Sequence, residues 1–526
     1  MDKFFYCYNS KCQKVNSTSV FSFDPFFLAI KDLMLSELRQ IVFYINKIKD
    51  FDVDMSLYRD KVIEFIAVLI VNLDFHRESF FVIAEDLYKN KLQIQELYSK
   101  LCDENNTKPE HIYKSNYELN GKHSVLQALN DIEKNINKDE ISFSKQRKNL
   151  YDIMLNLVLN ACNSLIELKN YGIDLPDEKD EVLNLLNTTN LTALTDDEWI
   201  EKINDFAKTN YTITKILNDK IVEKFGPIKK STVPRNIKKG KCILVSGGSF
   251  ADLEKILTES KNDDINIYVS DDMMSAFSFE KLSAKTNLTG CYSSDKEGEL
   301  FNSFPGPIFI SGSIINEVNA IRGQIYTDAK YPPLGIGKIS DNDFSPLIDY
   351  AKKMSGFSDE KERPSLDIGY SQSEIDGLID ELSQKVNKNE IKNIIIFSPC
   401  RNEEHIKNYV NEFMSIPQKD NYIISFSYKF SRKNFKYFNT NYDFTLAYQL
   451  VSKLKELNLN SHISVFLFDL KTSVISTVFN FKYLGVKNIF IAHCCKNSIN
   501  SDLSKGLSEM FGIKEISSAK DDFQYI

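Results

Sequence analysis

Two different hydrophobic patterns divide this chain. From Asp24 to about Phe225, apolar residues recur three and four positions apart, as in "DPFFLAIKDLMLSELRQIVFYINKI" and "KNLYDIMLNLVLNACNSLIELKNYG". This spacing is typical of helices with one apolar face. It predicts an N-terminal domain built of helix bundles.

The last helix of this region carries signals at both ends. Thr195-Asp196-Asp197-Glu198 fits a capping box, and Phe225-Gly226-Pro227 supplies a glycine and a proline that stop a helix. A domain boundary therefore follows, near residues 228 to 238.

After that boundary, short apolar runs alternate with helical stretches, which is typical of a parallel sheet with crossover helices. The first series is "KCILVSGG", "INIYVS", "GPIFISGS" and the helix "FSPLIDYAKKM". The same pattern restarts after the charged linker "SDEKERPS", with "KNIIIFSPC", "NYIISFSY", "HISVFLFD" and "VKNIFIAH".

The predicted fold class is α plus α/β, an N-terminal helix-bundle domain followed by two Rossmann-like parallel-sheet α/β domains. The predicted domain ranges are 1–228, 229–364 and 365–526. A length of 526 residues gives each domain enough chain to bury its own core.

Composition narrows the class of protein. A hydrophobic content of 42% argues against disorder, and no apolar run is long enough to span a bilayer. The N-terminus "MDKFFYCYNS" lacks the features of a secretory signal, so we expect a soluble, cytoplasmic protein with reduced cysteines. The net charge is -8 and the basic runs are short, so the chain has no extended positive surface that would attract nucleic acid. We expect neither a nucleic-acid nor a membrane partner.

Candidate chemistry should gather at the carboxyl ends of the predicted strands, because ligands of open parallel sheets bind in the crevice where the strand order reverses. That rule selects a short set of tripeptides: Gly247-Gly248-Ser249, Ser270-Asp271-Asp272, Ser311-Gly312-Ser313, Ser398-Pro399-Cys400, Ser427-Tyr428-Lys429, Asp469-Leu470-Lys471 and His493-Cys494-Cys495.

The glycine pair after the first strand has two interpretations. Gly247-Gly248-Ser249 could place amides of a helix N-terminus around a phosphate. The stretch lacks the G-x-G-x-x-G and GK[ST] patterns, so a tight strand-to-helix turn is favoured over a nucleotide site.

The cysteines do not form a complete metal site by spacing. Cys7 and Cys12 are two potential ligands where tetrahedral and iron–sulfur sites normally use four. Cys102 and Cys162 lie in helical patterns and are expected to be buried apolar residues. Cys400 could pair with His405 as a nucleophile and its base, but an inert thiol at a strand end is favoured because His405 lies more than one turn along the following helix.

Several stretches from about Phe225 onward resemble the hybrid cluster protein family, also called prismane proteins or hydroxylamine reductases and related to nickel carbon monoxide dehydrogenases. These stretches are "KFGPIKKSTVPRNIKKGKCILVSGGSFADLEKIL", "INIYVSDDMM", "FPGPIFISGS", "IKNIIIFSPCRNEEHIKNYVNEF" and "FKYLGVKNIF". The helical region matches more weakly, in pattern and length. The resemblance implies a cubane cluster on N-terminal cysteines and a hybrid iron–sulfur–oxygen cluster held by one histidine, two glutamates and four cysteines. It also implies reduction of hydroxylamine or nitric oxide with electrons from a partner reductase.

Most of those ligand positions hold other residues in this chain. The family's histidine falls on Gly248, its first glutamate on Asp272 and its first cysteine on Ser313 or Ile314. The second cysteine falls on Cys400, which keeps the thiol.

The remaining positions lose their ligands as well. The third cysteine falls on Tyr428, and the fourth falls between Tyr437 and Asp443, where there is no cysteine. Lys471 stands at the second glutamate, and Ser473 stands at the lysine beside it. An ammonium group repels iron and cannot coordinate it while protonated.

Two main hypotheses follow. In the first, the chain is a cluster-free pseudoenzyme that binds a small molecule or a protein partner, such as an intact family relative, and carries no cofactor. In the second, it is an iron–sulfur oxidoreductase with an altered metal site at the remnant positions Cys7, Cys12, Asp272 and Cys400. A nucleotide-binding module at residues 247–249 is a weaker third alternative.

Overall fold

A computed structural model describes most of the chain. The described residues are 25–68, 77–111, 117–135, 144–191, 193–293, 301–311, 322–330, 332, 335–398, 403–426, 436–440, 444–468, 472–492 and 501–526. The described residues group into two compact units, one within residues 25–213 together with residues 330 and 332, the other within residues 214–329 and 335–526. The finer division at residues 228 and 364 stays a prediction.

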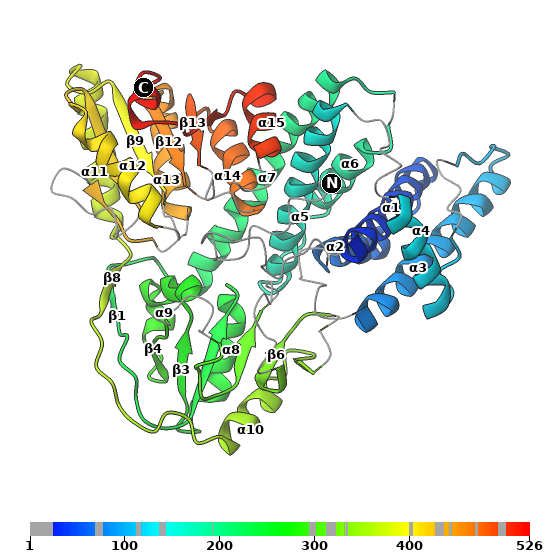
Figure 1. The fold of residues 1–526 in the computed structure, drawn as a ribbon, viewed down its shortest axis with the longest axis horizontal. Coiled ribbons are helices and arrows are strands. Elements are labelled where there is room, and N and C mark those ends of the chain that lie inside the picture. The colour runs from blue at the N-terminus through cyan, green and yellow to red at the C-terminus, as the bar shows by residue number, and fades with distance from the viewer. Residues whose placement is uncertain are drawn as a thin grey trace. The chain divides into compact units, whose positions relative to one another are not determined.

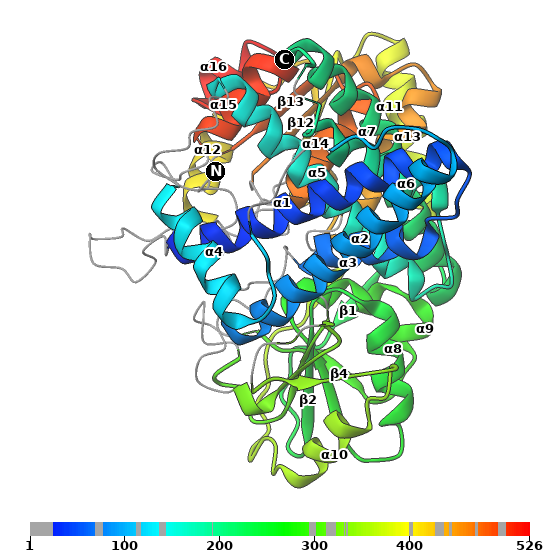
Figure 2. The same ribbon diagram turned by 90° about the vertical axis from the view of Figure 1, so that its right-hand side faces the viewer.

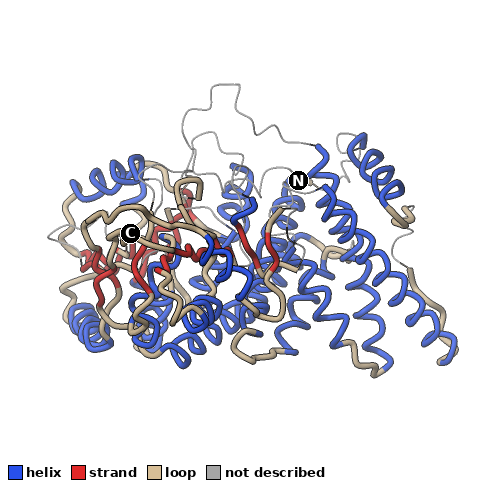
Figure 3. Tube along the Cα trace, turned by 90° about the horizontal axis from the view of Figure 1, so that it is seen from below, coloured by secondary structure: helices blue, strands red, loops and turns tan. Residues whose placement is uncertain are grey.

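The regular elements described in the first unit are helices, as the apolar spacing predicts (Figure 3). They are α1 (Pro25–Ile48), the 3-10 turn η1 (Lys49–Phe51), α2 (Ser56–Val68), α3 (Arg77–Glu104), α4 (Lys122–Asn135), α5 (Lys145–Lys169), α6 (Pro176–Thr188) and the start of α7 (Asp196–Phe225). Helix α1 packs along α3 and α4, and the three lie side by side in Figure 2.

Helix α7 begins and ends where the sequence signals place it. The Thr195 backbone N–H donates to the Glu198 carboxylate at 2.6 Å, and the Glu198 N–H donates to Thr195 Oγ1 at 3.3 Å. These reciprocal bonds form a capping box. At the other end, Gly226 has a positive φ of 90°, a conformation that glycine adopts at low cost.

The second unit contains two six-stranded parallel sheets (Figure 1). The elements of the first are β2 (Cys242–Ser246), α8 (Phe250–Glu259), β3 (Asn266–Val269), η3 (Asp271–Ser278), α9 (Glu280–Ser283), β4 (Leu288–Cys291), β5 (Ile308–Ile310), η4 (Arg322–Gln324), β6 (Ile325–Thr327), β7 (Gly337–Lys338) and α10 (Ser345–Lys353). The strand order is β4-β3-β2-β5-β6-β7, so the order reverses between β2 and β5.

The second sheet repeats this plan. Its elements are α11 (Gln372–Asn387), β9 (Asn393–Phe397), α12 (Glu403–Ser415), β10 (Asn421–Ser425), β11 (Lys436–Tyr437), α13 (Thr445–Glu456), η6 (Asn460–His462), β12 (Ile463–Leu467), α14 (Thr472–Tyr483), β13 (Asn488–Ile491), α15 (Ser501–Phe511), β14 (Lys514–Glu515) and α16 (Ala519–Phe523). The order β11-β10-β9-β12-β13-β14 reverses between β9 and β12. The predicted fold class, helices followed by two Rossmann-like parallel sheets, is confirmed.

Apolar burial explains why the central strands form. Every residue of β2 and β12 is buried, as expected for strands covered on both faces. In the second sheet, the Phe466 and Phe490 rings stack in parallel with centroids 4.3 Å apart, next to Phe397 and Phe413.

A short antiparallel ribbon precedes and follows the first sheet in sequence. It pairs β1 (Ser231–Val233) with β8 (Leu366–Ile368). The sequence pattern did not predict either strand, because each has only three residues and draws its hydrogen bonds from a partner more than 130 positions away.

Among the described residues, no helix combines the length and the apolarity that crossing a membrane requires.

A buried ion pair in the helical unit yields a first prediction. Lys91 Nζ lies 2.7 Å from a Glu37 carboxylate oxygen, and the two side chains are only 3% and 1% exposed. Lys91→Met should lower the free energy of unfolding by about 3–5 kcal/mol, because it leaves a buried carboxylate without its cation. Differential scanning calorimetry would measure the loss.

The double variant Glu37→Leu with Lys91→Met is the matched control. It removes both charges, so much of the lost stability should return. If the double variant is less stable than Lys91→Met alone, the loss does not come from an uncompensated charge.

Candidate functional site

The first candidate lies where strand order reverses in the first sheet. Strand β2 ends at Ser246, and Gly247 and Gly248 follow with φ angles of 107° and 96°. Residues with a Cβ rarely adopt such angles. Ser249 then caps α8, its Oγ accepting a hydrogen bond from the Asp252 N–H at 3.3 Å. The glycine pair therefore makes the tight strand-to-helix turn that the sequence favoured.

This turn touches the end of β5. Ser246 is level with Ile310 in the parallel register, so the next residues of both strands are neighbours. A Cβ on Gly247 would lie 2.3 Å from the Ser311 carbonyl oxygen. The Ser249 N–H donates to Ser311 Oγ at 3.2 Å, and the Ser311 N–H donates to the Ser246 carbonyl at 3.0 Å. Backbone atoms of the turn at Gly247 therefore lie directly against the end of β5, at the place where strand order reverses.

Asp272, which the resemblance predicts to be a remnant ligand position, lies in the turn after β3 and reaches this site. Its exposed carboxylate accepts hydrogen bonds from the Gly247 N–H at 3.1 Å and from Ser246 Oγ at 3.3 Å, and also from Ser270 Oγ. The Asp272 carboxylate is therefore held by hydrogen-bond donors of the chain itself. Beside it, Gly248 has no side chain, and among the described residues no atom other than those of its chain neighbours lies within 4 Å of a Cβ built there.

The second candidate lies at the corresponding position of the second sheet. Ser398, after β9, is 2% exposed, and its Oγ accepts from the Phe468 N–H, after β12, at 3.1 Å. The two strands that lead to Cys400 and Lys471 are therefore tied together at their ends. Several candidates lie outside the described residues, namely Cys7, Cys12, Ser313, Cys400, Tyr428, Asp469, Lys471 and the stretch 493–495. Their roles stay predictions.

The described cysteines behave as apolar residues. Cys102 and Cys162 are buried in helices, as predicted, and Cys242 and Cys291 are buried in strands. Burial raises the pKa of the Cys242 thiol to about 12, so it stays protonated near neutral pH. The part of the chain that the structure describes holds no group of three or more His, Cys, Asp or Glu residues able to bind a metal.

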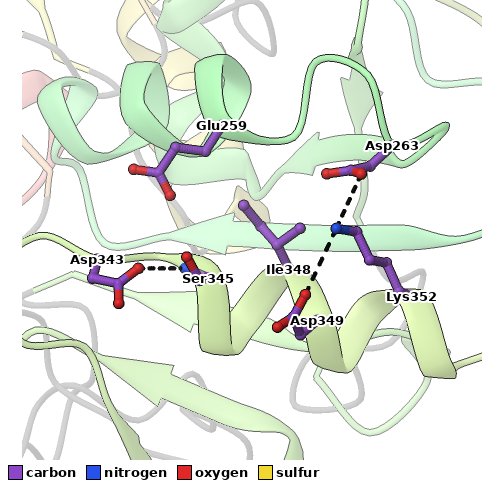
Figure 4. A pocket seen from close by; sticks show the side chains of 7 residues that line it. All are labelled: Glu259, Asp263, Asp343, Ser345, Ile348, Asp349 and Lys352. Atoms are coloured by element: carbon purple, nitrogen blue, oxygen red, sulfur yellow. Dashed lines mark hydrogen bonds and ion pairs between the residues drawn. The ribbon is translucent and has the colours of Figure 1, made fainter.

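An acidic pocket of about 440 Å³ lies elsewhere in the first α/β segment (Figure 4). It is lined by Glu259, Asp263, Asp343, Ser345, Ile348, Asp349 and Lys352. Lys352 pairs with Asp263 at 3.0 Å, and the Ser345 N–H donates a hydrogen bond to the Asp343 carboxylate at 3.0 Å. Glu259 ends α8, the helix that leads back to the start of β3. The pocket therefore belongs to the amino ends of the strands, away from the candidate sites.

One buried acid near the first site, in the first turn of α8, was not predicted from the sequence. Asp252 is 1% exposed, and its Oδ2 has no hydrogen-bond partner among the described residues. Burial and the nearby charge of Asp328 raise the pKa of Asp252 to about 7, although Ser249, Lys255 and Lys224 act in the opposite direction. Nothing in the sequence signals this burial, because acids in a first helical turn are usually solvated.

This carboxyl should make the protein less stable as the pH rises. Between about pH 4 and pH 7 the folded chain keeps a proton that the unfolded chain has released, so stability falls across that window and stays low above it. Asp252→Asn, which resembles the protonated acid, should match the wild type near pH 4 and exceed it by about 2–4 kcal/mol at pH 8. Thermal unfolding at both pH values would show this difference. An equal difference at both would contradict the buried acid.

The turn geometry predicts different costs for its two glycines. Gly248→Ala should cost about 1–2 kcal/mol, because its positive φ is strained but its surroundings are open. Gly247→Ala should cost more, since its Cβ also collides with Ser311 backbone atoms. Hydrogen exchange of the β2 amides would compare the two variants. Equal protection in both would show that the contact with β5 is not rigid.

Residues 7–427 match the model of the Prismane/CO dehydrogenase family. A hydroxylamine reductase from Thermodesulfovibrio yellowstonii is 24% identical over 349 residues, covering 63% of this chain and 65% of the relative. One from Shigella boydii serotype 18 is 25% identical over 346 residues, covering 61% and 62%. The match thus spans slightly less than two thirds of each relative.

Among solved structures, the chain is similar to alpha subunits of acetyl-CoA synthase/carbon monoxide dehydrogenase described with NiZn[Fe4S4] and NiNi[Fe4S4] clusters. The TM-score is 0.44 at 10% identity, covering 95% of this chain and 81% of that one. This likeness is too weak to support a site. The family match, by contrast, extends over most of the sequence, and the chain belongs to the Prismane/CO dehydrogenase family.

Proposed function

We propose that this chain is a cytoplasmic member of the hybrid cluster protein and hydroxylamine reductase group that has lost its clusters. In this proposal it serves as a non-redox protein that binds a small molecule or a protein partner, such as an intact relative. The observation that carries the proposal is the donor chemistry at the two places where strand order reverses.

At the first place, the residues present do not fit an iron–sulfur cluster. Gly248 offers no donor where the resemblance implies a histidine. Asp272 keeps an oxygen, but the Gly247 N–H and the Ser246 hydroxyl already donate to it. Iron–sulfur centres are normally held by thiolates, and the described turn supplies hydroxyl groups in their place.

At the second place, the sequence supports the same conclusion. Cys400 is a single thiol, while Tyr428 and Lys471 stand at two further ligand positions. A protonated lysine adds positive charge where iron would need neutralisation. For the cubane cluster, Cys7 and Cys12 supply two thiols where four are normal. Because the donors do not fit, we derive no redox step for this chain.

The competing hypothesis is an oxidoreductase that reduces hydroxylamine or nitric oxide. It requires iron on the remnant positions Cys7, Cys12, Cys400 and Asp272, with further ligands from elsewhere. The names of the relatives favour this activity, and the changed ligand positions oppose it.

Metal content separates the two hypotheses. Protein made anaerobically with excess iron should contain no stoichiometric iron or acid-labile sulfide and should be colourless. Chelation should leave its melting temperature unchanged, because proteins that draw folding energy from a metal lose stability without it. Elemental analysis, absorption spectroscopy and calorimetry supply the measurements.

The hydroxylamine reductase of Thermodesulfovibrio yellowstonii, made under the same conditions, serves as the loading control. Several irons per chain, together with a melting temperature that falls on chelation and returns with iron, would refute the cluster-free proposal. Cys400→Ser would then test the metal site, since loss of iron in that variant would identify Cys400 as a ligand.

A further inference from the structure

Three segments meet beside β4, the edge strand of the first sheet. The chain before β2 runs next to β4, because the Cys291 N–H donates to the Pro234 carbonyl at 2.8 Å. The chain before β8 joins it through a bridge between Ile237 and Lys361. These contacts bring residues 235, 293 and 363 together, although none of them is at a cluster-ligand position implied by the resemblance.

Two arginines bind the same serine at this junction. Arg235 donates from Nη2 to Ser293 Oγ at 2.6 Å, and Arg363 donates from Nη1 to the Ser293 carbonyl oxygen at 2.9 Å. Arg363 is further fixed by its N–H, which donates to Asn236 Oδ1 at 2.8 Å, and by the Tyr292 ring, whose centroid is 5.8 Å from its guanidinium carbon. Both arginines are half-buried, and Ser293 is 6% exposed.

Within the described part of the chain, neither arginine of this junction forms an ion pair, although Arg235 and the carboxylate of Asp271 both act electrostatically on the Cys291 thiol. No aspartate or glutamate oxygen there lies within 4.0 Å of either guanidinium. The Arg235 Nε is buried and has no acceptor among the described residues. A buried donor without a partner lowers the stability of the folded state by about 1–3 kcal/mol. A ligand that supplies an acceptor to this donor would remove that cost.

We propose that Arg235, Arg363 and Ser293 form a binding site for an oxyanion, the phosphate or carboxylate group of a small ligand. Guanidinium groups present planar pairs of N–H donors that match such groups, and each arginine keeps donors beyond the one that Ser293 uses. The Ser293 hydroxyl accepts from Arg235, which leaves its own proton free to donate to the anion.

The position of the site suits a ligand. Ser293 follows the carboxyl end of β4, the side of an open parallel sheet where ligands bind. No residue of this site occupies a cluster position, so it is independent of the cluster-free proposal.

Titration calorimetry at constant ionic strength tests the site with inorganic phosphate in one arm and malonate in the other. The wild type should bind at least one of the two saturably, with one site per chain, and the arm that binds identifies the phosphate or the carboxylate class. Arg235→Gln and Arg363→Gln should each weaken binding about tenfold or more, the loss expected for one charged hydrogen bond. Lys239→Gln, which removes an exposed charge from the same segment, should bind like the wild type.

Ser293→Ala tests whether the variants lose binding only because the structure around the arginines is disturbed. It removes the hydroxyl but keeps the carbonyl oxygen that Arg363 uses. Its melting temperature without ligand should stay near that of the wild type, while its affinity for the anion falls. No saturable binding of either anion, or equal affinity in all four variants and the wild type, would overturn the proposal.

Discussion

Close backbone contact between the β2–α8 turn and the end of β5 fixes the first place where strand order reverses. Gly247 allows this approach because any Cβ would meet the Ser311 backbone at 2.3 Å. Once the contact forms, Ser249 can bond to Ser311 and cap α8, and the turn amide of Gly247 is presented to Asp272. The absence of a Cβ at Gly247 therefore allows the start of α8, the end of β5 and the Asp272 carboxylate to come together.

The same contact explains what this site can do chemically. Hydroxyl groups and backbone amides gather there, and the carboxylate of Asp272 already accepts from them. An anionic ligand would face that carboxylate, so the turn is poorly suited to phosphate despite its position at a helix N-terminus. At the edge strand β4 the balance is reversed, since Arg235 and Arg363 bring two positive charges to one serine. The centre and the edge of one sheet thus differ in charge, with a carboxylate at the first and two guanidinium groups at the second.

In parallel sheets of this kind, the residues that determine function lie at the strand ends, and the buried strands form the core. All residues of β2 and β12 are buried, whereas functional side chains of such sheets lie in the loops after the strands. Side chains in those loops can therefore change while the buried strands stay the same, except where, as at Gly247, the backbone itself needs a particular residue. This separation is consistent with a chain that belongs to the family by its overall sequence and for which we propose a loss of cluster ligands.

The sequence by itself determined the elements whose signals are local. Apolar spacing located α1 and α5, the pattern from Thr195 to Glu198 marked the start of α7, and buried runs located the central strands. The alternation of strands and helices gave the fold class, and the rule for strand ends placed Asp272 beside Gly247. Short edge strands such as β14 escaped prediction, because two residues carry no periodicity.

Tertiary structure alone decided the features that depend on distant partners. Burial of Asp252 follows from packing around the first turn of α8, where its sequence position suggests an exposed acid. The junction of Arg235, Ser293 and Arg363 joins residues up to 128 positions apart, and none of them is unusual in its local sequence. The physical reason is the same in both cases. Local pattern encodes which face of an element is apolar, whereas burial and charge at a point depend on every segment that folding brings to it.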